Sequence, residues 1–144
     1  MKKPLSFLIP VVLVTAGLVM LSTVTRGSQE AGQPKPYTAK FFGPWNAAVA
    51  KKHIPEVTFE KMGAALMVTV KVDDHPMDPQ KPHYIMWIRV EDGSGKILAS
   101  KDFKPTDPSP VATFHLASWP ENLRVLERCN IHGIWLNEVK VTLK

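Results

Sequence analysis

The chain has 144 residues, of which 44% are hydrophobic and 22% are charged, and its formal net charge is +5. Three of the basic residues lie within residues 1–28, so the remainder carries 15 Lys and Arg against 13 Asp and Glu, a net charge of +2. This balance excludes the strongly basic surface typical of nucleic-acid-binding proteins, and the single cysteine excludes an intrachain disulfide scaffold.

Residues 1–28 have the pattern of an export signal. Lys2 and Lys3 precede an uncharged run from Leu5 to Val24, which as a helix reaches about 30 Å and can cross a bilayer. No clear small-residue cleavage site follows, so this segment is either a removed signal peptide or a retained membrane anchor formed by residues 5–24. Both alternatives predict an exported, periplasmic protein, and only the retained anchor would attach it to the inner membrane.

Residues 29–40 are polar and contain Gly and Pro, so they are expected to form a linker. Residues 41–144 then form one domain, which is large enough to bury a core without disulfides. The stretch from Trp45 to Ala50 favours a short helical turn. Because Pro55 disfavours helix at Ile54, His53 is expected to lie in a loop.

From Val57 onward the sequence predicts about seven short strands. The clearest signal is residues 66–72, where apolar positions alternate with Met67, Thr69 and Lys71. Residues 92–95 form a predicted hairpin turn. The remaining strands are predicted at residues 57–59, 84–90, 96–100, 111–116, 123–127 and 135–143. This spacing favours an all-β sandwich of immunoglobulin-like type.

One cysteine and four histidines are candidate metal ligands. Cys129 and His132 are separated by two residues, and His53, His75 and His83 lie close to prolines. A single buried cysteine is often only a small hydrophobe, and a single histidine is more often structural than a ligand. Together, however, a thiolate and several imidazoles suit Fe, Cu, Zn or Ni. The fifth histidine, His115, is interpreted as a structural residue of a strand.

Four sequence blocks resemble the motifs of the superoxide reductases, the desulfoferrodoxin/neelaredoxin family. They are Lys52-His53-Ile54-Pro55, His75-Pro76-Met77, His83-Tyr84-Ile85-Met86-Trp87-Ile88 and Cys129-Asn130-Ile131-His132-Gly133-Ile134-Trp135. The resemblance implies one non-haem iron per chain, held by four equatorial histidines and one axial cysteine. The equatorial ligands would be His53, His75, His83 and His132, and the axial ligand Cys129.

The resemblance also implies an activity, the reduction of superoxide to hydrogen peroxide by one electron from an external donor, such as a small redox protein. Lys52 resembles the family lysine that attracts superoxide and helps to protonate the product. A second iron domain would need four more cysteines, so a one-iron, neelaredoxin-type member is expected. A homo-oligomer is compatible with the sequence, whereas a nucleic-acid partner is not.

The chain departs from the family pattern at two places. Lys51 stands where the family usually has a glutamate, so ferric iron is expected to keep water or hydroxide at its open position. The interval from His75 to His83 is eight residues, longer than the family usually has, and its prolines allow the extra residues to bulge outward.

Two other functions compete with this interpretation. A cupredoxin-like copper protein for electron transfer would also be a β-sandwich with Cys and His ligands, but commonly has a methionine just after its C-terminal histidine. No methionine follows Met86 in this chain. A structural zinc module would need only four ligands, fewer than the five candidates.

Overall fold

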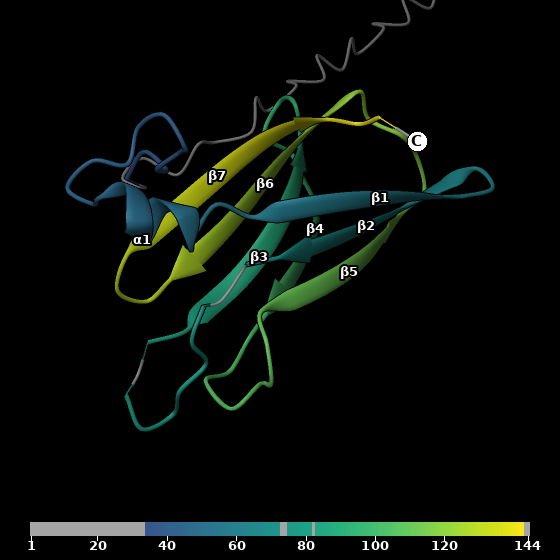
Figure 1. The fold of residues 1–144 in the computed structure, drawn as a ribbon. Coiled ribbons are helices and arrows are strands. Elements are labelled where there is room, and N and C mark those ends of the chain that lie inside the picture. The colour runs from purple at the N-terminus through teal and green to yellow at the C-terminus, as the bar shows by residue number, and fades with distance from the viewer. Residues whose placement is uncertain (1–33, 73–74, 82, 143–144) are drawn as a thin grey trace, which may run out of the picture.

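The structure is a computed structural model that describes residues 34–72, 75–81 and 83–142. This part of the chain contains one short helix and seven strands (Figure 1). The elements are α1 (Ala47–Lys51), β1 (Glu56–Met62), β2 (Ala65–Lys71), β3 (Ile85–Asp92), β4 (Ile97–Asp102), β5 (Val111–Leu116), β6 (Asn122–Cys129) and β7 (Gly133–Lys140).

The strands form two antiparallel sheets, which confirms the prediction of an all-β fold. One sheet has the order β1-β2-β5, and the other has the order β4-β3-β6-β7. Figure 1 shows α1 beside the turn between β6 and β7, at the end of the molecule away from the β1–β2 hairpin. The candidate site lies at this α1 end.

A large apolar core joins the two sheets, and alternate side chains of β2 and β5 point into it. In β2, for example, Leu66, Val68 and Val70 are fully buried and the intervening side chains are not. Burying one such side chain contributes roughly 1.5–3 kcal/mol. The same core includes Cys129, the last residue of β6. The core therefore reaches the candidate site and supports it directly.

Some strand boundaries differ from those predicted. β1 continues to Met62 and β6 continues to Cys129, where the predictions ended at residues 59 and 127. β7 covers Gly133–Lys140, whereas the predicted strand covered residues 135–143. The reason is strand pairing: β1 pairs with β2 as far as Met62 opposite Ala65, and the register of β6 with β7 runs from Asn122 opposite Lys140 to Cys129 opposite Gly133. A neighbouring strand thus fixes limits that alternation alone does not.

A short segment before α1 adds to the edge of β7. Tyr37 forms a parallel bridge with Trp135. Its N–H donates to the carbonyl of Ile134 and its carbonyl accepts from the N–H of Leu136, both at 2.8 Å. The backbone of Tyr37 is therefore tied to the four-stranded sheet.

The predicted signal or anchor in residues 1–28 lies outside the described residues. Within residues 34–72, 75–81 and 83–142, no helix has the length and apolar character needed to cross a membrane.

Glu127 is an exception to the apolar character of the interior. It lies on β6 opposite Ile88 and Trp135, its exposed fraction is 0%, and neither carboxylate oxygen has a hydrogen-bond partner. Burial raises the pKa of this carboxyl well above its ordinary value. Glu127 therefore keeps its proton to a much higher pH than an exposed glutamate does.

We expect Glu127→Gln to stabilise the metal-free protein increasingly as pH rises. Above the ordinary pKa of 4.5, the unfolded state releases the Glu127 proton and the folded state retains it. The free energy of unfolding of the unchanged protein therefore falls by up to about 1.4 kcal/mol per pH unit, a penalty that glutamine lacks. Urea unfolding of both proteins at several pH values measures the difference. A difference that does not vary with pH would contradict a buried neutral carboxyl.

Candidate metal centre

His53 is positioned by α1 and by the turn that ends it. The side chain of Asn46 caps the helix by accepting from the N–H of Val49 at 3.0 Å. After the helix, the His53 N–H donates to the carbonyl of Ala50. The His53 ring then donates from Nδ1 to the carbonyl of Val49 at 2.7 Å. This bond fixes the tautomer and leaves the lone pair of Nε2 free to bind a metal.

His75 and His83 come from the connection between β2 and β3. The Nδ1 of His75 donates to the carbonyl of Pro76 at 2.8 Å, while its Nε2 is buried without a hydrogen-bond partner. His83 pairs with Asp78 in an isolated bridge just before β3. The next residue, Tyr84, donates from its N–H to the side-chain oxygen of Asn130. That contact ties the His83 segment to the β6–β7 turn.

Cys129 and His132 are brought together by the tight β6–β7 turn. The N–H groups of Ile131 and His132 both donate to Sγ of Cys129 at 3.4 Å. Gly133 closes the turn with φ +83°, a conformation that favours glycine. Burial raises the pKa of the Cys129 thiol above its ordinary value, although the hydrogen bonds from the two N–H groups oppose this shift. A coordinated cation would deprotonate the thiol outright.

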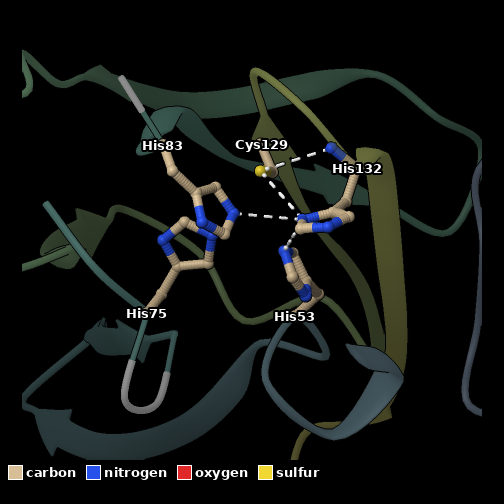
Figure 2. A group of neighbouring side chains, drawn as sticks. All are labelled: His53, His75, His83, Cys129 and His132. Carbon is tan, nitrogen blue, oxygen red and sulfur yellow. Dashed lines mark hydrogen bonds between the residues drawn. The ribbon is translucent and has the colours of Figure 1, made fainter. Parts of the chain in front are cut away.

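The five side chains point towards one another, as Figure 2 shows. One ligand atom from each of His53, His75, His83, Cys129 and His132 can be chosen so that all lie within 4.8 Å of one another. Nδ1 of His132 lies 3.1 Å from Nε2 of His83, 3.1 Å from Nε2 of His53 and 3.5 Å from Sγ of Cys129. The structure therefore brings together all five residues that the sequence predicted as ligands.

These distances are better explained by a shared cation than by hydrogen bonds. The single proton that a neutral His132 ring carries cannot satisfy three neighbouring acceptors. By contrast, two nitrogens bound at right angles, each about 2.1 Å from one metal ion, lie about 3 Å apart. The unpartnered Nε2 of His75 also requires a partner at this point. Four imidazoles and a thiolate form a suitable donor set for a transition metal such as iron.

Burial keeps the imidazoles ready for metal binding. Desolvation lowers the pKa of His53 to about 4 and that of His75 to about 3, although the hydrogen bonds to Val49 and Pro76 oppose the shift. Burial also lowers the pKa of His83 and of His132. All four rings are therefore neutral near pH 7, which is the form that binds metals.

A cleft of about 370 Å³ opens onto one side of the cluster. Among the described residues, its lining includes one lysine, Lys52, and no carboxylate. Neither Lys51 nor Cys129 lines it. The lining residues are Asn46, Ala48, Val49, Lys52, His53, His75, Pro76, His83 and His132. The cleft is thus open to a small anion, and the sulfur lies away from it.

Three residues near the centre were not predicted from the sequence. Asn46 and Val49 line the cleft, and the ring of Trp45 meets that of His132 edge-on at 4.7 Å between centroids. Asn46 carries a recognisable signal, since asparagine before a helical stretch is a favoured cap. Trp45 and Val49 carry no such signal, because their positions depend on how α1 packs.

Comparison with known proteins gives a consistent result. The desulfoferrodoxin family model matches residues 46–138. The superoxide reductase of Thermococcus kodakarensis is 38% identical over 107 residues, which cover 67% of this chain and 90% of the relative. That of Pyrococcus abyssi is 36% identical over 110 residues, covering 69% and 92%. The solved superoxide reductase (neelaredoxin) from Ignicoccus hospitalis is 25% identical with a TM-score of 0.61, covering 76% and 95%.

The purified protein is expected to bind one iron per chain, and Cys129→Ser is expected to lose the visible absorption that a sulfur–iron bond produces. The matched control is His115→Ala, because His115 is exposed on β5 and should affect neither iron content nor colour. Elemental analysis and the absorption spectrum of the oxidised protein measure both properties. If Cys129→Ser kept the same absorption band, Cys129 would not be a ligand.

Proposed function

The chain belongs to the desulfoferrodoxin family, and we propose that it is a superoxide reductase working at one non-haem iron held by the five converging side chains. The observation that carries this function is the His4Cys cluster with a cleft on one side. The relatives named above are superoxide reductases. Iron, when bound, supplies one electron, and superoxide with two protons then becomes hydrogen peroxide.

His53, His75, His83 and His132 would hold the iron through neutral rings, and Cys129 would hold it through a thiolate. Ferrous iron with one thiolate and four neutral imidazoles carries a single net positive charge, which attracts an anion. The hydrogen bonds from Ile131 and His132 to Sγ stabilise the thiolate and hold it in place. Because Cys129 is only 1% exposed, its sulfur is shielded from water.

Lys52 would guide superoxide into the cleft and help to protonate the product. It lines the cleft together with all four histidines of the cluster, and its charge adds to the burial that lowers the pKa of His53 and His83. A positive potential at a site mouth can raise the association rate of an anion roughly 10- to 1000-fold. Within residues 34–72, 75–81 and 83–142, no carboxylate lines the cleft and opposes this effect.

The donor set and the relatives give the copper alternative no support. Blue-copper sites use two histidines and a cysteine with a weak axial ligand, which would leave two of the four converging imidazoles unused. A structural zinc would likewise leave one of the five donors unused.

The cellular setting is also a proposal. Residues 1–28 would direct export to the periplasm, as a removed signal or as an anchor, and residues 29–40 would link that segment to the iron-binding domain of residues 41–144. The support is the pair of lysines before an uncharged run. Electrons would come from an external small redox protein, and a homo-oligomer is the proposed assembly. The strand orders β1-β2-β5 and β4-β3-β6-β7 support an immunoglobulin-like class of sandwich.

Rapid mixing of the ferrous protein with superoxide tests the function. A reductase yields one hydrogen peroxide for each superoxide consumed and leaves the iron oxidised. A dismutase would yield one peroxide for every two superoxide ions and release oxygen. Formation of oxygen with that stoichiometry would exclude the proposed reaction, and a protein that stays metal-free in excess ferrous salt would exclude the site.

Lys52→Ala is expected to slow superoxide capture on the order of tenfold and to weaken its dependence on ionic strength. Lys51→Ala is the matched control, because it removes an equal charge from the adjacent residue, which does not line the cleft. Rapid mixing at several salt concentrations compares the two variants, with iron content as the check on folding. Equal slowing in both would show that net charge, and not the position of Lys52, governs capture.

A carboxylate introduced at residue 48 should reach the iron, whereas one at residue 51 should not. Ala48 lines the cleft and Lys51, at the end of α1, does not. We therefore expect Ala48→Glu to change the absorption spectrum of the oxidised protein and Lys51→Glu to leave it nearly unchanged. Lys51→Glu makes the larger change in charge, so a larger spectral effect there would contradict the placement of α1.

A further inference from the structure

Two aromatic rings connect the metal centre with the surface of the protein. The ring of Trp135 stacks on that of His53 with 5.1 Å between centroids and 28° between planes. The ring of Tyr37 lies 5.2 Å from that of Trp135. Trp135 is fully buried, whereas Tyr37 is partly exposed. The series His53, Trp135, Tyr37 therefore runs outward from the candidate iron ligand in two short steps.

The ring of Tyr37 is held firmly at the end of this series. Its backbone forms hydrogen bonds with Ile134 and Leu136, the two residues that flank Trp135. Two glycines with positive φ face the ring: a Cβ added at Gly43 would lie 2.6 Å from it, and one at Gly133 would lie 3.3 Å from it. The first distance is too short for any side chain, so the local backbone is shaped around this ring.

We propose that Trp135 and Tyr37 form an electron relay that protects the centre when hydrogen peroxide reacts with it. This inference rests on the proposed function, because peroxide is the product of that reaction. Peroxide needs two electrons and two protons to become two waters. One electron comes from ferrous iron, which becomes ferric. The other comes from the Tyr37 phenol by way of Trp135, and the phenol proton with one proton from solvent completes the balance.

The step leaves a neutral tyrosyl radical at Tyr37, which a one-electron reductant of the kind that reduces the iron can return to tyrosine. Electron tunnelling weakens exponentially with distance, so two short transfers between neighbouring rings are faster than one long transfer. Without the relay, hydrogen peroxide would take its second electron from the most easily oxidised group near the iron. That group is the Cys129 thiolate, whose further oxidation to sulfinic and sulfonic acids is irreversible.

Trp45 offers a less suitable route for the same electron. Its ring meets that of His132 edge-on, at 86° between planes, which gives less overlap than the stacked Trp135. Its Nε1–H is buried without an acceptor, so an oxidised Trp45 could not readily lose its proton. Trp135, by contrast, donates from Nε1 to the carbonyl of His132 at 3.2 Å.

Tyr37→Phe tests the relay, because phenylalanine keeps the packing but cannot supply the electron and proton. The chain has two tyrosines, so Tyr84→Phe is the matched control. Each iron-loaded protein is first mixed with superoxide, which tests the proposed function separately. The ferrous protein is then mixed with one equivalent of hydrogen peroxide without oxygen, frozen rapidly and measured by EPR. Cysteine oxidation is measured by mass spectrometry.

We expect a tyrosyl radical in the unchanged protein and in Tyr84→Phe, and none in Tyr37→Phe. Irreversible oxidation of Cys129 should rise several-fold in Tyr37→Phe, while its reaction with superoxide and its iron content stay unchanged. The relay would be excluded if the radical persisted in Tyr37→Phe, if Cys129 oxidation were equal in all three proteins, or if Trp45→Phe removed the radical. A normal superoxide reaction beside any of these results would leave the proposed function standing.

Discussion

Two hydrogen bonds from imidazole rings to backbone carbonyls determine the chemistry of the metal centre. His53 donates to Val49 and His75 donates to Pro76, so each ring keeps its proton on the outer nitrogen and turns a lone pair inward. Both rings are almost fully buried, and burial disfavours a second proton. Each acceptor lies within four residues of its histidine in the sequence. The local backbone around each histidine, more than distant packing, therefore orients the ligand.

The centre has two chemically different sides. On one side, the Cys129 sulfur lies at the end of the sandwich core and accepts hydrogen bonds from two N–H groups of the β6–β7 turn. On the other, the cleft is bordered by imidazoles, small apolar side chains and Lys52. An incoming anion therefore meets an opening that carries the positive charge of Lys52, and not the electron-rich thiolate. The division follows from the fold, since β6 delivers the sulfur from the interior while α1 forms part of the opening.

The ligands and most strands could be predicted from the sequence because they depend on local signals. Alternation identified β2, and the proline-flanked histidines with Cys129 and His132 identified the cluster. Features that depend on packing between distant segments could not be predicted. The approach of α1 places Ala48 and Val49, and not Lys51, at the cleft. Likewise, alternation places residue 127 on the same face of β6 as Leu123 and Val125, but it does not indicate that a carboxyl group there would be buried without a hydrogen-bond partner.

The bridge between Tyr37 and Trp135 has a consequence for assembly. β7 is the last strand of its sheet, and an unprotected last strand can recruit a strand from another molecule and begin aggregation. Tyr37 already occupies backbone groups of Ile134 and Leu136 along that edge. A shortened chain that began after residue 37 would lack these two hydrogen bonds and would present the backbone groups of Ile134 and Leu136 to a strand of another molecule.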